Sequence, residues 1–421
     1  MNILLMNHYA GSPEMGMEFR PYYLAREWVK MGHRVDIIAA DYSHLRMKNP
    51  HVSKDFQEEQ IDGISYHWVK AGRYSGNGVK RALTMFRFVG KLLVHAKKIA
   101  KEWKPDVVIT SSTYPLDTYA GQRIARFSKA RLVHEVHDMW PATLIEIGGM
   151  SKCHPFIVVL QMAENSAYRH SSFVVSLLPK AKDYMVQHGM KPDKFVEIPN
   201  GIVLDDWKNP EELPKEHKAV LEKIKQEEKF VVGYFGGHAL TNALDLLLDA
   251  AKEVRKENIQ FVLVGGGVEK SRLMKRAEEE GIKNMCFLGA VSKKEVPSLV
   301  TYFDCSYLGV KNSPLYRFGI CMNKMYDSMM AGKPMVCAVN TPDSAVERYQ
   351  CGILISTVNA AQIAKAIEEL EQMSNEERRA IGERGKQAVL KYFTYDILAR
   401  KFLDLFTGEE KNETKINEQN C

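Results

Sequence analysis

The chain has 421 residues, of which 45% are hydrophobic and 26% are charged. These fractions are ordinary for a soluble globular protein, and they provide enough apolar surface for two separate cores. The formal net charge of +6 is too small for this length to indicate a nucleic-acid partner, so we expect none.

Three further features bear on where the protein works. The first residues, MNILLMNHYAG, begin a strand without a basic segment, so we expect no signal peptide. No run approaches the ~18 apolar residues that a membrane-spanning helix needs. Seven cysteines lie at irregular spacings without a Cys-x-x-Cys pair, which suits a reducing cytosol and small buried side chains. We therefore expect a cytoplasmic protein.

The first half of the chain alternates short apolar runs with helical patterns. Residues 3–6 and 34–40 read as strands around a helix from Pro21 to Met31, which Gly32 ends. Such a βαβ unit predicts a parallel sheet. The same alternation continues in strands at 106–110, 131–136, 173–177 and 195–198, with a helix at 117–127.

A second alternation follows a polar, charged stretch at 205–229, where we place a domain boundary; a surface loop within one domain is the alternative. Strands are expected at 230–235, 260–264, 285–288, 304–308 and 334–338, and helices at 242–256, 269–280, 293–302 and 323–330. Two such α/β units predict two doubly wound domains facing a cleft, with ligands at the carboxyl ends of the strands. The predicted domains are 1–205 and 206–390, followed by a helix over 391–407 and a disordered tail over 408–421.

Two glycine-containing loops follow predicted strands. The loop over residues 11–16 contains Gly11, Ser12 and Gly16 and precedes a helix, an arrangement that suits a bound anion. It matches neither a dinucleotide fingerprint nor a P-loop, so an ordinary turn is the alternative. Gly237 and His238 follow the strand at 230–235, where a diphosphate fits and the histidine can carry positive charge. A solvated loop histidine is the alternative there.

The most specific pattern spans residues 313–334. A loop containing Gly319 leads into a helix on which Lys324 and Asp327 are three positions apart, and so share one face near its start. An acid can accept both hydroxyl groups of a ribose, and a lysine can neutralise phosphate. An exposed ion pair between the two residues is the alternative.

His137 follows the predicted strand at 131–136 and is expected at the rim of the cleft. It could bind a sugar hydroxyl or carry a proton, although a structural loop histidine is the alternative. His134 and His137 lack a third ligand at suitable spacing, so we expect no metal site.

Residues 79–104 contain eight lysines or arginines against one acid, with apolar residues at helical spacing. Such a basic amphipathic helix can lie on an anionic bilayer. A helix that packs on the core and has a solvated basic face is the alternative.

Taken together, these residues resemble family 4 of the retaining glycosyltransferases, which have the GT-B architecture. Residues 8–13 and 17–28 look like a branch that builds bacterial surface polysaccharides and is similar to the enzyme adding N-acetyl-L-fucosamine to O-antigen units. Residues 198–201, 236–238 and 313–334 fit the same branch, and the match runs from residue 1 to about 406.

The resemblance implies roles for single residues. Asp327 matches the family's second acid and would hold the donor ribose, whereas Gly319 stands where the family's first acid is expected. The diphosphate or the transferred sugar would then be bound by backbone amides at Gly319 and Ile320, with Lys324 as the cation. His137 matches a histidine that contacts the transferred sugar. The whole donor-binding set expected is Gly237, His238, Arg317, Phe318, Gly319, Ile320, Asn323 and Asp327.

The resemblance also implies a reaction. A nucleotide-diphosphate sugar, carrying an N-acetylated amino sugar or a deoxy sugar, reacts with a saccharide or polyprenyl-linked acceptor, without a metal or other cofactor. The basic helix at 79–104 would bind the inner leaflet of the membrane. A GT-B epimerase-like or phosphorylase-like enzyme and a non-catalytic nucleotide-sugar-binding protein are the rival interpretations. A Rossmann oxidoreductase is disfavoured because no dinucleotide fingerprint is present.

Overall fold

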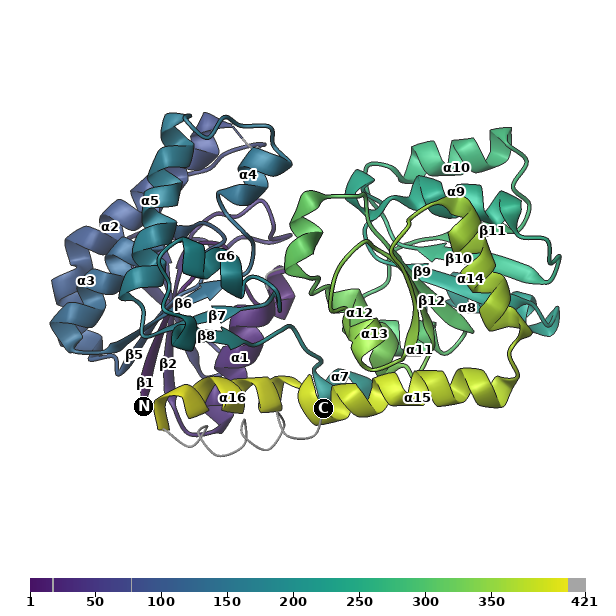
Figure 1. Ribbon diagram of the computed structural model, residues 1–421. Helices are drawn as coiled ribbons and strands as arrows, with labels where there is room; N and C mark the ends of the chain where they lie inside the picture. The colour runs from purple at the N-terminus through teal and green to yellow at the C-terminus, as the bar shows by residue number, and fades with distance from the viewer. Residues whose placement is uncertain (17–18, 77, 408–421) are drawn as a thin grey trace. The chain divides into compact units, whose positions relative to one another are not determined.

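The computed structural model describes residues 1–16, 19–76 and 78–407 (Figure 1). The chain forms two compact α/β units. The first consists of Met1–Pro199 together with the last described helix, α16 (Tyr395–Thr407), and the second of Asn200–Thr394. Expectations for Met17, Glu18 and the tail 408–421 lie outside the described residues.

An eight-stranded sheet forms the centre of the first unit, in the order β3-β4-β2-β1-β5-β6-β7-β8. Neighbouring strands are parallel, except for the antiparallel pair β3–β4. The strands are β1 (Asn2–Met6), β2 (Arg34–Ala40), β3 (Gln57–Ile61), β4 (Ile64–Val69), β5 (Val107–Thr110), β6 (Arg131–Val136), β7 (Phe173–Ser176) and β8 (Phe195–Glu197). The chain reverses its direction of winding beside β1, which lies between β2 and β5.

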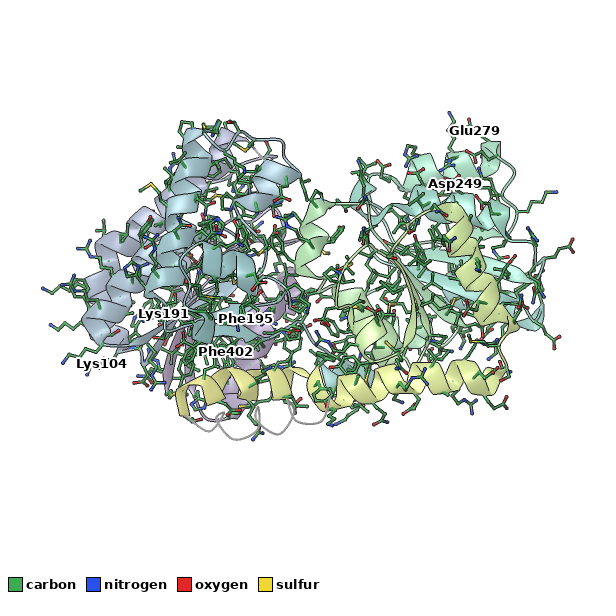
Figure 2. The ribbon with its side chains drawn as sticks, viewed as in Figure 1. Lys104, Lys191, Phe195, Asp249, Glu279 and Phe402 are labelled. Carbon is green, nitrogen blue, oxygen red and sulfur yellow. The ribbon has the colours of Figure 1, made fainter. Side chains whose placement is uncertain are left out.

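Helices cover this sheet. They are α1 (Phe19–Lys30), α2 (Val79–Trp103), α3 (Thr118–Ser128), α4 (Ala142–Glu146), α5 (Pro155–His170), α6 (Lys182–Gln187) and α16, with short 3-10 helices η1 (Pro13–Met15), η2 (Pro115–Asp117) and η3 (Pro192–Lys194). The returning helix α16 packs on α1: the Trp28 indole N–H donates to the Ala399 carbonyl at 3.0 Å. Phe402, labelled in Figure 2, is fully buried with its ring 5.2 Å from that of Trp28. A helix that returns to the first unit is as predicted.

The second unit contains a six-stranded, wholly parallel sheet in the order β11-β10-β9-β12-β13-β14. Its strands are β9 (Phe230–Phe235), β10 (Ile259–Val264), β11 (Met285–Leu288), β12 (Cys305–Gly309), β13 (Met335–Ala338) and β14 (Gly352–Ile355). Its helices are α7 (Leu204–Lys208), α8 (Lys215–Gln226), α9 (Leu244–Glu253), α10 (Lys270–Glu279), α11 (Val296–Val300), α12 (Asn323–Met330), α13 (Ala345–Arg348), α14 (Ala360–Gln372) and α15 (Asn375–Tyr392), with 3-10 helices η4 (Leu240–Asn242) and η5 (Pro314–Phe318). Every β9 residue is buried, as expected for a central strand with helices on both faces.

The structure differs from the sequence expectations in several elements. The hairpin β3–β4, the strand β14 and the helix α5 were not predicted. The helix expected over 242–256 is the shorter α9, because Ala243 adopts a left-handed conformation with φ of 46° between η4 and α9. The helix expected over 293–302 is reduced to α11.

The division between the units falls after Pro199, earlier than the boundary expected after residue 205. The segment that follows pairs with the end of the second unit, since the Ile202 amide donates to the Phe393 carbonyl at 2.8 Å and Ile202 forms a parallel bridge with Thr394. The chain returns to the first unit only at Tyr395, rather than at residue 391. Among the described residues, no helix is both long and apolar enough to cross a bilayer.

Candidate functional site

In the second unit, two glycine loops touch each other at the carboxyl ends of β9 and β10. The Gly236 amide donates to the Val264 carbonyl at 3.0 Å, and the His238 amide donates to the Gly266 carbonyl at 2.7 Å. A Cβ atom at Gly265 would lie 1.9 Å from the Gly236 carbonyl oxygen, so no side chain fits there. Glycine is therefore required for the approach of the two loops, and it leaves the backbone beside Gly237 open.

His238 lies under this pair of loops, and it is fully buried rather than a solvated loop residue. Neither of its ring nitrogens has a hydrogen-bond partner among the described residues. Burial, together with the charges of Lys270 and Lys324, lowers the pKa of His238 to about 4. A pKa this low disfavours the positive charge that His238 can carry, which agrees with the assignment of the cation to Lys324. Buried polar atoms are seldom left unpaired, so this ring suits contact with a ligand.

Lys324, on the first turn of α12, supplies a cation at these loops. Its Nζ donates to Asn242 Oδ1 at 3.0 Å and to the Tyr234 hydroxyl at 3.2 Å, and it lies 4.6 Å from the centre of the Tyr234 ring. Asn242 and Tyr234 both donate to the Gly237 carbonyl, at 2.8 and 2.7 Å. Burial lowers the pKa of Lys324 to about 8. Within the described chain no carboxylate pairs with this ammonium, so the alternative of a Lys324–Asp327 ion pair is wrong.

Asp327 is buried on the same helix and has a different partner. Lys293 Nζ lies 2.6 and 2.5 Å from its two carboxylate oxygens. Lys293 precedes α11, in the segment after β11, and no sequence pattern indicated a role for it. Lys293 and Asp327 are 34 positions apart in the chain, so residue spacing could not have identified Lys293 as the partner of Asp327.

The loop before α12 forms the short helix η5, with the Ser313 hydroxyl accepting from the Leu315 amide at 3.3 Å. Arg317 lies over the Phe318 ring at 4.2 Å. Gly319 has a φ of 96°, and its amide donates to the Tyr316 carbonyl at 3.0 Å. This amide is therefore already used, which contradicts part of the expected diphosphate contact. Ile320 is buried, whereas Asn323 is exposed at the start of α12.

His137 belongs to the first unit and follows β6. Its Nε2 lies 2.9 Å from Glu135 Oε2 and 2.8 Å from the Ser111 hydroxyl, which follows β5. Glu135 is fully buried and forms an ion pair with Arg20 of α1 at 2.9 Å. The ring thus sits at the carboxyl edge of the sheet, and the groups that hold it were not predicted. Glu135 is two positions from His137 in the sequence, but no role was predicted for it. Arg20 could not be predicted as its partner, because 115 positions separate Arg20 from Glu135.

The loop expected to bind an anion in the first unit forms η1. The Gly11 carbonyl accepts from the Tyr66 hydroxyl of β4 at 2.7 Å, and within the loop the Ser12 carbonyl accepts from the Met15 amide at 2.9 Å. Gly16, with a φ of 71°, donates its amide to the Pro13 carbonyl at 3.2 Å. The connection from Gly16 to α1 lies outside the described residues, so the expected contact of this loop with an anion stays a prediction.

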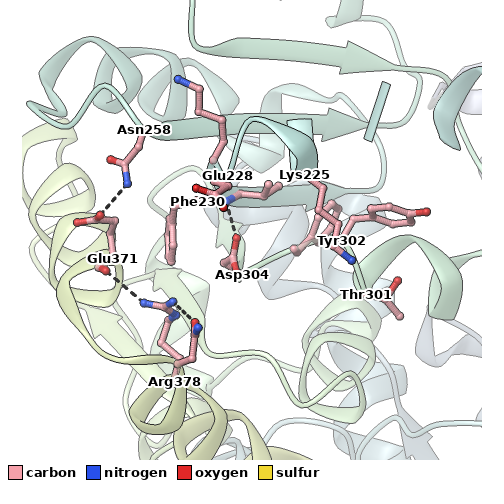
Figure 3. A pocket seen from close by; sticks show the side chains of 13 residues that line it. Lys225, Glu228, Phe230, Asn258, Thr301, Tyr302, Asp304, Glu371 and Arg378 are labelled. Carbon is pink, nitrogen blue, oxygen red and sulfur yellow. Dashed lines mark hydrogen bonds between the residues drawn. The ribbon is translucent and has the colours of Figure 1, made fainter. Parts of the chain in front are cut away.

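A separate cavity of about 370 Å³ lies at the starts of β9 and β10, at the opposite edge of the second sheet (Figure 3). Arg378 lies 5.2 Å from the Phe230 ring centre and donates to the carbonyl groups of Leu370 and Glu371. Asp304 accepts from the Val231 amide at 2.8 Å. These bonds join α14 to α15 and β9 to the residue before β12. No group of three or more metal-ligating side chains occurs in the described part of the chain.

Comparison with known families agrees with this arrangement. Residues 216–388 match the family described as glycosyl transferases group 1, and residues 15–201 match the glycosyl transferase 4-like domain. Both units therefore resemble glycosyltransferase domains. Each of the two matches covers most of one structural unit, and the group 1 match contains the glycine loops, Lys324, Lys293 and Asp327.

A curated relative of the chain is the putative colanic acid biosynthesis glycosyl transferase WcaI of Escherichia coli. The two chains are 25% identical over 219 residues, which is 49% of this chain and 51% of WcaI. The chain therefore spans about half the length of the curated relative it matches.

Solved structures show the same fold over nearly the whole chain. HepE of Anabaena, in complex with UDP, is 16% identical with a TM-score of 0.68, covering 97% of this chain and 100% of that one. Sucrose-phosphate synthase of Thermosynechococcus elongatus is 16% identical with a TM-score of 0.72, covering 97% and 99%. WaaG, a glycosyltransferase involved in lipopolysaccharide biosynthesis, is 14% identical with a TM-score of 0.64, covering 96% and 100%. The chain thus has the predicted GT-B fold of two Rossmann-like α/β units.

Proposed function

We propose that this protein transfers a sugar from a nucleoside-diphosphate sugar to a saccharide acceptor, with retention of the anomeric configuration, in the synthesis of a cell-surface polysaccharide. The observation that carries the proposal is Lys324, a largely enclosed ammonium without a carboxylate partner in the described chain, beside the open backbone of Gly237. An anion completes such a site, and a diphosphate matches it. The UDP bound to HepE, the putative role of WcaI in colanic acid biosynthesis and the role of WaaG in lipopolysaccharide biosynthesis support this choice.

The diphosphate is assigned to the glycine loops. Lys324 neutralises its charge, and the amide of Gly237 donates to its oxygens. The neutral His238 ring offers one donor and one acceptor at the same place, so it bonds to a phosphate oxygen without adding charge. The amide of Ile320 and the side chains of Arg317, Phe318 and Asn323 border the same donor.

The ribose is assigned to Asp327. Each carboxylate oxygen has two lone pairs, so the bonds to Lys293 leave acceptor capacity for the hydroxyl groups of a ribose. Lys293 fixes the orientation of the carboxylate before the donor binds. Pre-orientation lowers the entropy that binding would otherwise cost.

The reaction proposed begins with cleavage of the bond between the donor's anomeric carbon and the diphosphate oxygen. The bonding electrons leave with the diphosphate, which Lys324 and the loop amides stabilise. The acceptor hydroxyl attacks the anomeric carbon from the face that the diphosphate leaves, and its proton passes to a phosphate oxygen. His137 is assigned to a hydroxyl group of the transferred sugar. No metal or other cofactor takes part in this scheme.

A lipid-linked acceptor is proposed because α2 presents two different faces. Its buried face includes Met85, Phe88 and Leu92. Its exposed face combines apolar with basic side chains: Val79, Leu83, Phe86 and Val94, with Arg87, Lys97, Lys98 and Lys101. An exposed apolar face edged with positive charge suits an anionic lipid surface.

The adjacent helix α5 extends this surface. Phe86 of α2 contacts Phe156 of α5, with ring centres 6.2 Å apart. Beyond Phe156, α5 exposes Val158, Val159 and Met162. We therefore propose a peripheral enzyme on the cytoplasmic face of the membrane, where a polyprenyl-linked saccharide would meet it.

The activity can be tested by screening nucleoside-diphosphate sugars for thermal stabilisation, since a ligand that binds only the folded state raises the melting temperature. The stabilising donor is then incubated with lipid-linked saccharides, and NMR of the product gives its anomeric configuration. Transfer with retention is expected. An inverted product would refute the retaining mechanism, and an epimerised free sugar without transfer would favour an epimerase. A donor that binds and never reacts would identify a non-catalytic binding protein.

A further inference from the structure

The hydrogen bonds around His137 determine which of its nitrogens carries the proton. Nε2 lies 2.8 Å from Ser111 Oγ and 2.9 Å from Glu135 Oε2, and Ser111 Oγ lies 2.6 Å from the same Glu135 oxygen. A carboxylate oxygen only accepts hydrogen bonds, so the serine must give its single proton to Glu135. Neither neighbour can then donate to Nε2. The ring nitrogen must itself be the donor.

Nε2 of His137 must be the donor only as long as Glu135 remains a carboxylate. Burial would raise the pKa of Glu135, but the charge of Arg20, with hydrogen bonds from His137 and Ser111, lowers it well below its usual range. Arg20 Nε donates to Glu135 Oε1 at 3.0 Å. The guanidinium is also bound to the carbonyl groups of Ile198 and Pro199, at 2.8 and 2.5 Å. Glu135 Oε1 must therefore stay an acceptor, because a fixed arginine faces it.

The other ring nitrogen of His137 has no such partner. Nδ1 makes no hydrogen bond to any described residue, and the side chain keeps 14% of its surface exposed. A neutral imidazole that is protonated on Nε2 has a lone pair at Nδ1. Nδ1 can then accept a hydrogen bond from a hydroxyl group but cannot donate one.

We infer that Glu135, held by Arg20, is a positioning residue that keeps neutral His137 protonated on Nε2 and presents Nδ1 as an acceptor for a substrate hydroxyl group. The nature of that hydroxyl rests on the proposed function, which makes it a hydroxyl of the transferred sugar. The fixed tautomer removes one of the two hydrogen-bonding states of the ring before substrate arrives. It also favours a sugar that carries a free hydroxyl at this position over a deoxy or alkylated analogue.

The test is nitrogen NMR of the substrate-free full chain with labelled histidine, followed over a pH titration. The chain has 13 histidines, and the His137 signals are assigned by their loss in His137→Gln. In the neutral form we expect a protonated-type shift at Nε2 and an unprotonated-type shift at Nδ1. The reverse assignment in the wild-type protein would overturn the inference, whatever the variants do.

Glu135→Gln supplies the sharper comparison. Arg20 requires an oxygen at the Oε1 position, so the amide nitrogen of the glutamine takes the place of Oε2 and donates toward Nε2. The proton of neutral His137 should then move to Nδ1. In Ser111→Ala the carboxylate remains and the proton should stay on Nε2. An unchanged tautomer in Glu135→Gln, or a changed one in Ser111→Ala, would contradict the role given to Glu135.

These spectra do not depend on glycosyl transfer. A proton on Nε2 in a protein that transfers no sugar would refute the proposed function and leave the positioning role intact. A proton on Nδ1 in a protein that does transfer sugar would refute the positioning role alone.

Discussion

Lys324 and Asp327 lie three positions apart on α12, yet their side chains contact different groups. Lys324 bonds to Asn242 and Tyr234, whereas Asp327 bonds to Lys293. Exposed residues at this spacing often form an ion pair, but here both side chains are largely enclosed and other polar groups are closer. The lysine and the acid can therefore serve different parts of one donor, and each can be tested separately.

The first prediction concerns the charge of Lys324. Burial lowers its pKa to about 8, and a bound diphosphate favours the ammonium form. Affinity for UDP should therefore be highest below pH 8 and fall as the pH rises above it, by up to about tenfold per pH unit. Lys324→Met should lower affinity at pH 7 by about 1.5–3 kcal/mol, the range for a hydrogen bond to a charged group.

Calorimetry from pH 7 to 9.5 provides the measurement. Lys324→Arg is the matched control, because arginine stays protonated over this range and should remove the pH dependence. Wild-type affinity that does not change across this range would exclude Lys324 as the diphosphate cation.

The second prediction concerns Asp327. Asp327→Ala should lower affinity for UDP by about 1–3 kcal/mol through loss of the ribose contact. A nucleotide without the 2′ and 3′ hydroxyl groups should bind the variant and the wild type equally. Lys293→Met is the control for the ion pair, and it should lose less affinity than Asp327→Ala. If the deoxy nucleotide shows the same loss on Asp327→Ala, the carboxylate does not bind the ribose.

At the scale of elements, α2 illustrates how one sequence pattern supports two interpretations at once. A core-packing helix and a basic amphipathic helix were alternatives for residues 79–104. The structure shows that one face of α2 is buried while basic and apolar side chains share the other. Lys91 is an exception, because its Nζ lies 2.7 Å from Asp55 Oδ2 and it also bonds to the Lys70 carbonyl.

The third prediction therefore uses basic residues that are exposed. Replacing Arg87, Lys97 and Lys98 by glutamine should weaken binding to vesicles containing phosphatidylglycerol by about 3 kcal/mol, at about 1 kcal/mol per charge. Replacing Lys218, Lys223 and Lys365, exposed in the second unit, gives the same change in charge and should have little effect. Co-sedimentation measures both variants. Equal losses would indicate attraction by net charge, and no loss in either would exclude α2 as a membrane contact.

At the scale of the whole molecule, the two units are assigned different parts of the proposed function. Each has its own parallel sheet and its own core, and α16 belongs to the first unit although it ends the described chain. The groups assigned to the nucleotide all lie in the second unit, whereas His137, Glu135 and Arg20 lie in the first.

The fourth prediction follows from this division. Hydrogen exchange in saturating UDP should slow in the loops after β9 and β10 and at the start of α12, with little change around His137. His137→Asn should leave UDP affinity unchanged and lower the rate of transfer from the nucleotide sugar. Protection confined to the first unit, or loss of UDP binding in His137→Asn, would show that the donor site has been assigned to the wrong unit.

The sequence by itself predicted most of the fold. Buried strands such as β9 appear as continuous apolar runs, and the alternation with helices implies a parallel sheet, because both signals depend on residues close together in the chain. The hairpin β3–β4 could not be predicted in this way because β3 (QEEQI) is polar and mostly exposed, without the apolar pattern that marks a strand.

The sequence also located the loops and residue types of the candidate site, since glycines, Lys324, Asp327 and His137 follow strands or begin helices at recognisable positions. Only the tertiary structure decided their surroundings: Lys293 beside Asp327, Arg20 beside Glu135, and burial near Lys270 and Lys324 for His238. Hydrogen bonding and burial depend on which loops the strand order brings to one edge of a sheet. That order joins residues far apart in the chain, and local periodicity carries no information about it.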